Sequence, residues 1–198
     1  MNDALSTWEL RGVVIDVGGT RNPAPSYMEC LKGVASVKLT VVNIDPDAHP
    51  DVLADATALP SADASFDMAL CLNLLEHVDR PEVVMEEIAR VLRPGGTLIL
   101  ETPFLVKVHG HPQDFHRFTD TALRRMAEKA GLTVTEVTPL GGGPFLAGAA
   151  QVQPVVPKNV FIPLLWISQG CDAVVRKFRP QFMTGWPLGY LMVCTKPA

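Results

Sequence analysis

The chain has 198 residues, of which 47% are hydrophobic and 19% are charged, and its formal net charge is −4. This composition excludes a disordered chain and leaves enough residues for a proper core. Because no block of like charges is present, a dedicated nucleic-acid binder is also disfavoured. We therefore expect one globular domain that does not bind nucleic acid.

The cysteines are scattered, at positions 30, 71, 171 and 194, and none forms a Cys-x-x-Cys pair. This disfavours a metal cluster or a disulfide framework and fits a reducing cytosol. The first residues lack a basic region followed by an apolar stretch, and no apolar run is long enough to cross a bilayer. We expect a cytoplasmic protein without a signal peptide or a transmembrane segment.

The first predicted strand, residues 11–17, runs into a tight turn. Its apolar run ends in Asp16, and Gly18 and Gly19 follow at once. Glycines allow positive φ and let a ligand approach the backbone closely. In open α/β sheets, ligands bind beyond the carboxyl ends of the strands. Taken alone, this pattern fits an ordinary strand-to-helix turn equally well.

Strands and helices alternate along the rest of the chain. Further strands are predicted at 39–44, 51–55, 66–73, 97–101, 132–137 and 188–194. Helices are predicted at 27–34, 81–92 and 120–130. This alternation predicts βαβ units and a mostly parallel sheet. Too few residues separate the second and third strands for a full crossover helix, so that helix is expected to be reduced to a turn.

Local signals predict where two of these helices begin and end. Asp79 can cap the first, with Glu82 three residues later as in a capping box, and the Pro-Gly-Gly of 94–96 stops it. Thr119 can cap the second, and Gly131 lies just past its end.

A long insert, residues 139–186, separates the last two strands. It begins rich in Gly and Pro and then contains apolar residues at helical spacing: Leu164, Ile167, Cys171, Val174, Val175 and Phe178. Such a face is most often core, which is the interpretation we favour here. A lid, a dimer surface and a peripheral membrane patch are the alternatives. Basic residues are present but show no clear single face in the sequence.

Four segments together carry a family resemblance. They are Val-Ile-Asp-Val-Gly-Gly (14–19), Asn-Ile-Asp (43–45), the run from Ala54 to Asp67, and Leu-Glu-His-Val through Pro-Gly-Gly-Thr-Leu (75–98). Over residues 11–138 they resemble the class I S-adenosylmethionine-dependent methyltransferases. The resemblance implies a Rossmann-like α/β fold: a seven-stranded, mostly parallel sheet with helices on both faces and an antiparallel last strand at 187–195. It also implies one methyltransferase domain, 1–198, with a core of 11–138 and 187–195.

The resemblance implies S-adenosylmethionine as cofactor and S-adenosylhomocysteine as product. Gly18 and Gly19 would admit the methionine tail, and Asp16 would fix the loop and the ammonium group. The family's glycine loop often has further glycines where Thr20 and Asn22 stand here. Asn tolerates left-handed backbone, whereas Thr is stiffer, so the loop departs from the family pattern.

Residues after the next strands would complete the cofactor site. Asp45 is expected to accept both ribose hydroxyls, and Asp55 with the Ala56 amide to bind the adenine. Asn73 and Leu74 are expected to line the sulfonium side. Each of these acids also has an ordinary interpretation as a loop cap or turn residue.

Residues 109–119 contain three of the five histidines and resemble a His-x-x-Pro-x-Asp-x-x-Arg segment of a bacterial methyltransferase branch. Many members of that branch are found among surface-glycan and cell-envelope genes, which implies a sugar or envelope-linked acceptor. In the interpretation we favour, His109 and His111 are candidate general bases that take the acceptor's proton. In a second interpretation, these two with Asp114 and His116 bind a metal such as zinc; we predict no metal.

The third interpretation of this segment is structural. Asp114 and Arg117 would pair to hold the loop, and Phe115 and Phe118 would be core residues. We prefer this interpretation for these four side chains. His77 is expected to be structural or close to the cofactor.

The predicted function is methyl transfer from S-adenosylmethionine to a small-molecule or envelope/glycan-linked acceptor, at oxygen. One alternative is a catalytically inactive methyltransferase-like binding domain, which the imperfect glycine loop supports. A nicotinamide-dependent oxidoreductase is disfavoured because Gly-x-Gly-x-x-Gly does not follow the first strand. The sequence makes no prediction of oligomeric state.

Overall fold

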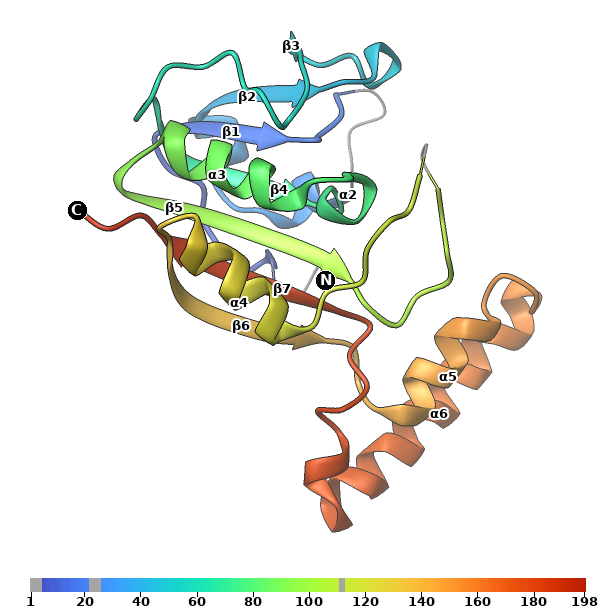
Figure 1. Ribbon diagram of the computed structural model, residues 1–198. Coiled ribbons are helices and arrows are strands. Elements are labelled where there is room, and N and C mark those ends of the chain that lie inside the picture. Colours follow the sequence, from blue (N-terminus) through green and yellow to red (C-terminus); the bar gives the residue numbers. More distant parts are fainter. Residues whose placement is uncertain (1–4, 22–25, 111–112) are drawn as a thin grey trace.

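The computed structural model describes residues 5–21, 26–110 and 113–198, and its centre is a seven-stranded sheet (Figure 1). The strands are β1 (Val13–Val17), β2 (Lys38–Asn43), β3 (Val52–Leu53), β4 (Phe66–Leu72), β5 (Leu92–Pro103), β6 (Thr133–Leu140) and β7 (Gly189–Thr195). Their order across the sheet is β3-β2-β1-β4-β5-β7-β6.

Five of the strands run in parallel, from β3 across to β5, and β7 runs antiparallel to both of its neighbours. The predicted sheet and its antiparallel last strand are therefore confirmed. Strand order reverses on either side of β1, since β2 lies on one side and β4 on the other. The carboxyl end of β1 is thus the point where an open α/β sheet binds its ligand.

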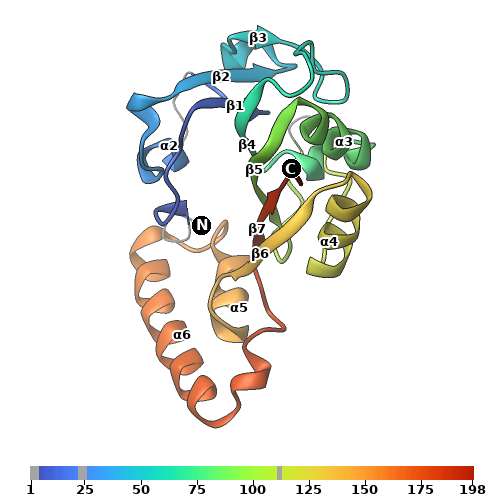
Figure 2. The same cartoon turned by 90° about the vertical axis from the view of Figure 1, so that its left-hand side faces the viewer.

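Helices cover both faces of the sheet, as predicted (Figure 2). The helices are α2 (Ser26–Cys30), α3 (Pro81–Val91), α4 (Asp120–Lys129), α5 (Pro144–Val152) and α6 (Lys158–Phe178). The 3-10 turns are η1 (Val34–Ser36), η2 (Pro46–Ala48), η3 (Leu75–His77) and η4 (Pro180–Phe182). One core cluster joins α3 and α4 to the sheet, and the other joins α2 and the N-terminal segment to it. Only η2 connects β2 to β3, so the reduced crossover is confirmed.

The cap at α4 is confirmed, whereas the cap at α3 is wrong. Thr119 Oγ1 accepts from the Ala122 N–H (3.3 Å), and Gly131 has a φ of +80° past the helix end. At α3 the N-cap is Arg80, and its side chain makes no capping hydrogen bond. Pro81 occupies the first helical position, where a residue without an N–H leaves one donor fewer to satisfy. After α3, β5 begins directly at Leu92, five residues before the predicted strand.

The insert forms a helical hairpin, α5 and α6, that projects from the end of the sheet (Figures 1 and 2). The prediction that its apolar residues are core is wrong for Ile167, Val174 and Phe178, which are 64%, 57% and 73% exposed. The two helices pack on each other, and no further layer covers their outer faces within the part of the chain that the structure describes. Among these residues, no helix combines the length and apolar character needed to span a bilayer.

Candidate active site

The glycine turn after β1 is held in place by β2. The Gly18 N–H donates to Val42 O (2.8 Å), and Asn43 Nδ2 donates to Gly18 O (3.1 Å) and Gly19 O (2.8 Å). Gly18 has a φ of +83°, and a Cβ there would lie 2.8 Å from Leu74 Cδ1. Only glycine fits this position. Sequence reasoning assigned no role to Asn43, although its place at the end of a strand was the available signal.

Asp16 supports the turn from beneath. Its side chain is buried and accepts a hydrogen bond from the Tyr27 hydroxyl (2.8 Å). A Cβ on Gly19 would lie 2.2 Å from Asp16 Oδ2, so the turn rests directly on this carboxyl group. Burial raises the pKa of Asp16 to about 6. Among the described residues, Asp16 Oδ1 has no hydrogen-bond partner, and it remains available to a ligand cation.

Thr20, where the loop departs from the family pattern, ties the turn to η2. Its hydroxyl donates to Ala48 O (3.0 Å), and the Arg21 N–H donates to the same oxygen (2.9 Å). The Arg21 guanidinium also pairs with Asp51 (2.5 Å). These hydrogen bonds fix the position of the turn although Thr20 stands where the family often has a glycine. Asn22 lies outside the described residues.

The two predicted cofactor acids follow β2 and β3, on the same sheet edge as the glycine turn. Asp45 is half-buried, and its Oδ1 accepts from the Asp47 N–H (2.9 Å). Asp55 is exposed, and its Oδ1 accepts from the Thr57 N–H (2.8 Å); Ala56 beside it is half-buried. Both acids therefore order their own loops, as the ordinary interpretation of each predicted.

The end of β4 meets the glycine turn. Asn73 has a positive φ of +53°, is exposed, and its N–H donates to Glu101 O on β5 (3.0 Å). Leu74 lies against Gly18. The structure thus brings together the residues predicted for the methionine tail and those predicted for the sulfonium side.

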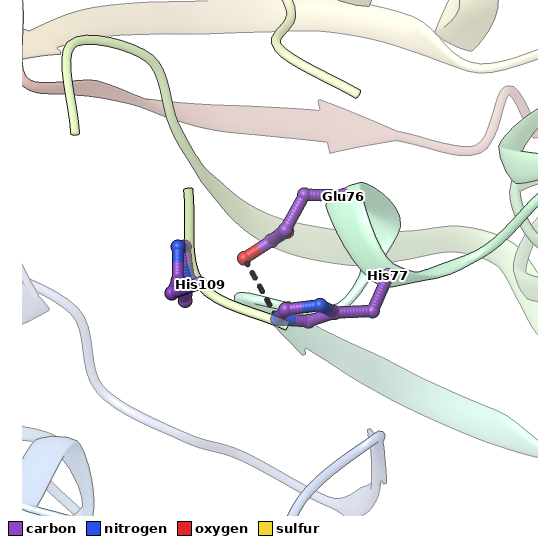
Figure 3. A group of neighbouring side chains, drawn as sticks. All are labelled: Glu76, His77 and His109. Carbon is purple, nitrogen blue, oxygen red and sulfur yellow. Dashed lines mark ion pairs between the residues drawn. The ribbon is translucent and has the colours of Figure 1, made fainter. Parts of the chain in front are cut away.

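Beyond Leu74, three side chains converge on one point: Glu76, His77 and His109 (Figure 3). One potential ligand atom from each lies within 4.8 Å of the others. The Glu76 side chain is fully buried, and His77 Nε2 lies 3.7 Å from its Oε1. The two imidazole rings meet edge to face, with centroids 5.3 Å apart. Sequence reasoning missed Glu76; its signal was an acid next to a histidine just after a buried strand.

Backbone carbonyls orient both imidazoles. His77 Nδ1 lies 2.5 Å from Gln113 O, and His109 Nδ1 lies 3.1 Å from Lys107 O. A carbonyl oxygen can only accept, so each Nδ1 carries the hydrogen in the neutral ring. The Nε2 lone pair of each ring is then available to a cation or a hydrogen-bond donor.

Two carboxyl groups in this region are buried without adequate compensation. Burial raises the pKa of Glu76 to about 7 and that of Glu101 on β5 to about 7, and the Glu76 charge adds to the rise at Glu101. Both groups are therefore poised to exchange a proton near neutral pH.

The structural interpretation of the 113–119 segment is confirmed for the Asp114–Arg117 pair. Asp114 is almost fully buried and accepts from both terminal nitrogens of the Arg117 guanidinium and from the His109 N–H (2.8 Å). Arg117 holds the pKa of Asp114 well below its usual range. Asp114 thus serves as a hydrogen-bond acceptor within the loop. Among the described residues, Asp114 and His116 do not belong to a common group of potential metal ligands. His116 Nε2 instead lies 3.4 Å from Asp79 O.

Phe118 is buried, as predicted, but Phe115 is 44% exposed, so its assignment to the core is wrong. The backbone of Phe115, not its ring, makes the contact with η3: its N–H donates to Glu76 O (2.7 Å). His111, the second candidate base, lies outside the described residues.

An apolar cavity of about 260 Å³ lies just after the end of β5. It is lined by residues that follow β5 and by the hairpin: Phe104, Leu105, Val106, Pro144, Ala147, Gly148, Gln151 and Trp186. The insert therefore supplies one wall of a space at the carboxyl end of β5.

Comparison with known proteins points to a methyltransferase. Residues 26–100 match a family model described as a methyltransferase domain, a match that begins after the glycine turn. An uncharacterized methyltransferase of Mycobacterium avium is 35% identical over 133 residues, which are 60% of this chain and 51% of that protein. The chain spans about half the length of the curated relatives it matches.

Solved methyltransferase structures share the fold. A SAM-dependent methyltransferase from Archaeoglobus fulgidus is 14% identical with a TM-score of 0.63, and the match covers 99% of this chain and 95% of that chain. A Burkholderia thailandensis 1,6-didemethyltoxoflavin-N1-methyltransferase, with 1,6-didemethyltoxoflavin and S-adenosylhomocysteine bound, is 19% identical with a TM-score of 0.54, covering 94% and 71%. Strand order, family match and curated relatives agree: the chain has the methyltransferase fold, and residues 26–100 are similar to a methyltransferase domain.

Proposed function

We propose that the protein transfers a methyl group from S-adenosylmethionine to a hydroxyl group of a small-molecule or envelope/glycan-linked acceptor. The main observation behind this proposal is the sheet edge at the carboxyl end of β1, where the strand order reverses. A strained glycine turn after β1, Asp45 after β2 and Asp55 after β3 line up there. The Archaeoglobus fulgidus neighbour of the same fold is SAM-dependent, which supports this cofactor.

The cofactor would lie across this edge. Gly18 and Gly19 allow its methionine tail to approach the backbone, and the unpartnered Asp16 oxygen faces the ammonium group. Asp45 accepts from the ribose hydroxyls. The adenine binds at Asp55 and the Ala56 amide, and the sulfonium lies beside Asn73 and Leu74, where β4 ends.

In the reaction, the acceptor oxygen attacks the methyl carbon as the carbon–sulfur bond breaks. The electron pair of that bond stays on sulfur, which gives S-adenosylhomocysteine, and the hydroxyl proton passes to a base, for which His109 is our candidate. Alignment of oxygen, carbon and sulfur supplies much of the rate. His109 lies on the acceptor side and promotes loss of the proton; His111 is assigned to the same task from the sequence.

The acceptor region lies between the 104–118 segment and the hairpin. The cavity beside Phe104 and Trp186 has a mostly apolar lining, which fits an acceptor with an apolar part, such as a lipid-linked glycan. The insert would then act as a wall or lid over the acceptor.

Calorimetric titration with S-adenosylhomocysteine tests the cofactor site. Asp45→Ala should weaken binding roughly 10- to 100-fold, because a hydrogen bond to a charged group contributes about 1.5–3 kcal/mol. Asp47→Ala is the matched control, since only its N–H, which alanine keeps, bonds to Asp45. Equal affinity for the wild type and Asp45→Ala would show that the ribose binds elsewhere.

Ligand binding without turnover is the second candidate function. It rests on Thr20 in place of a loop glycine and on a family match that starts after the turn. A folded protein that binds S-adenosylhomocysteine but methylates none of a panel of glycan and lipid-linked hydroxyl acceptors would favour it. Nicotinamide-dinucleotide binding in preference to S-adenosylhomocysteine would contradict both candidates.

A further inference from the structure

The Glu76 carboxylate stands out because it is fully buried and unsatisfied. Its exposed fraction is 0%, and neither oxygen has a hydrogen-bond partner among the described residues. Burying such a group is costly unless it is protonated, paired or bound to a metal. A cation bound between Glu76 and the neighbouring imidazoles would supply such a partner.

The charges around Glu76 favour a cation. The Arg117 guanidinium is held by Asp114 through two of its nitrogens and makes no hydrogen bond to Glu76, so it offsets the Glu76 charge only in part. Glu101, also buried, lies close enough for the two carboxylates to repel each other. Three buried carboxyl groups, those of Glu76, Glu101 and Asp114, therefore lie near one guanidinium group.

Two imidazoles face the same point. His77 Nε2 lies 3.7 Å from Glu76 Oε1, and His109 approaches the same group from the loop after β5 (Figure 3). The other nitrogen of each ring is engaged by a backbone carbonyl, of Gln113 and of Lys107. Metal-binding histidines are oriented in the same way, because the carbonyl fixes the tautomer that leaves Nε2 unprotonated.

The spacing suits a metal ion. Ligand atoms about 2.1 Å from a tetrahedral ion lie roughly 3.4 Å apart. The three potential ligand atoms lie within 4.8 Å of one another, so a contraction of at most about 1.4 Å would bring them into this geometry. Two histidines and one glutamate with an open fourth position are a ligand set of catalytic zinc sites.

We propose that Glu76, His77 and His109 bind one divalent transition-metal ion of the zinc class. This ligand set differs from the one considered from the sequence, in which Asp114 and His116 took part.

The role of the ion rests on the proposed function. The site lies at the carboxyl end of β4, on the acceptor side, so its open position can take the acceptor hydroxyl. A bound divalent ion lowers the pKa of an oxygen that coordinates it, so the hydroxyl proton leaves to solvent at neutral pH. His109 then promotes proton loss as a metal ligand.

Metal titration tests the site without any acceptor. The full-length protein is stripped with EDTA and titrated with Co²⁺, read by visible absorption, and then with Zn²⁺ by calorimetry. We expect one equivalent to bind with micromolar affinity or better. Glu76→Gln and His77→Ala should each weaken it at least tenfold. His116→Ala is the matched control, from the same loop but outside the group, and should leave affinity unchanged.

Two results would overturn the metal site: no stoichiometric binding to a folded wild type, or binding that Glu76→Gln leaves intact. A parallel titration with S-adenosylhomocysteine separates the two proposals. Cofactor binding without metal binding would remove the metal site and leave the proposed function standing. Metal binding without cofactor binding would remove the proposed function and leave the metal site standing.

A second, independent observation concerns the outer surface of the hairpin. Large apolar side chains on α6 are exposed there: Val160, Ile162, Trp166, Ile167, Val174 and Phe178. Figures 1 and 2 show the hairpin projecting from the end of the sheet, away from the rest of the chain. At helical spacing, Val160, Ile167, Val174 and Phe178 share one side of α6, and an exposed apolar face of this kind marks an interaction site.

The charges of the hairpin select the partner. Residues 139–186 contain four basic residues, all exposed: Lys158, Arg176, Lys177 and Arg179. Their one acidic residue, Asp172, is buried and accepts from the Phe145 and Leu146 N–H groups. The exposed charge is thus wholly positive in a chain whose formal net charge is −4. Two copies of this surface would repel each other, whereas an anionic surface would attract it.

We infer that the α5–α6 hairpin docks on an anionic lipid surface. Exposed tryptophan and phenylalanine enter the interfacial layer, and the basic side chains meet the lipid headgroups. This places the apolar cavity at the base of the hairpin close to the membrane.

Vesicle sedimentation tests the docking. We expect binding to phosphatidylcholine vesicles that contain phosphatidylglycerol, weak binding to phosphatidylcholine alone, and loss of binding in high salt. Lys177→Gln/Arg179→Gln and Trp166→Ser should each weaken partitioning roughly tenfold or more. Arg124→Gln/Arg125→Gln on α4 is the control of equal charge change. Absence of binding to anionic vesicles, or a stable dimer in solution that buries Trp166, would overturn the inference.

Discussion

Replacing Glu76 with glutamine exchanges a buried carboxyl group for a neutral side chain of nearly the same size. Burial raises the pKa of Glu76 from 4.5 to about 7, so the folded protein keeps a proton that the unfolded chain releases. The free energy of unfolding therefore falls as the pH rises from about 4.5 to about 7. At about 1.4 kcal/mol per pKa unit, Glu76 destabilises the metal-free fold by roughly 3 kcal/mol at pH 8 and by less than about 1 kcal/mol at pH 5.

Urea unfolding at pH 5 and pH 8, with EDTA present, measures this effect. Glu76→Gln should be more stable than the wild type by roughly 3 kcal/mol at pH 8, with the advantage nearly gone at pH 5. Glu86→Gln, an exposed site on α3 with the same change of charge, should stay within about 0.5 kcal/mol at both values. A Glu76→Gln effect that is equal at the two pH values would refute the reasoning.

Zn²⁺ added at pH 8 should make the wild type more stable than Glu76→Gln. A metal that binds only the folded wild type stabilises it by mass action, whereas Glu76→Gln lacks the carboxylate ligand and gains little. Stabilisation of both proteins to the same extent would mean that the ion binds elsewhere.

Two further substitution series have clear expected outcomes. Gly19→Ala should abolish S-adenosylhomocysteine binding in calorimetry, because its Cβ would lie 2.2 Å from Asp16 Oδ2, whereas Gly170→Ala on α6 meets no atom within 4 Å and should raise stability by roughly 0.5–1 kcal/mol in urea unfolding. Arg117→Lys loses the two-nitrogen contact with Asp114 and should cost about 1–3 kcal/mol at pH 7. That cost should shrink as the pH falls below the usual carboxylate range and Asp114 loses its charge.

Much of the fold follows from local patterns. The apolar run of Val13–Val17 and its glycines predicted β1 and its turn, and Thr119 with Gly131 predicted both ends of α4. These signals act over a few residues and were confirmed here, whereas the equally local Asp79 cap was not, because α3 begins at Pro81 after Arg80. The antiparallel last strand came from the family resemblance, since pairing across a sheet is not a local property.

For the hairpin, the spacing of apolar residues predicted a helix but not which of its faces is buried. The spacing of Ile167, Val174 and Phe178 predicted a helix correctly but said nothing of what covers each face. On α6, apolar residues occur on the exposed face as well as against α5, so the pattern could not separate core from interaction surface. Only the exposed fractions, together with the one-sided charge, separate these roles.

The cluster of Glu76, His77 and His109 could not be predicted from the sequence, for a different reason. In the sequence, His109 is grouped with neighbours such as Asp114, and the structural and functional interpretations of that loop compete. In the structure they depend on each other: Arg117 holds Asp114, and Asp114 in turn accepts from the His109 N–H, while the Phe115 N–H anchors the loop on η3. The ion pair that stabilises the loop is therefore also what turns His109 towards Glu76, 33 positions earlier in the chain.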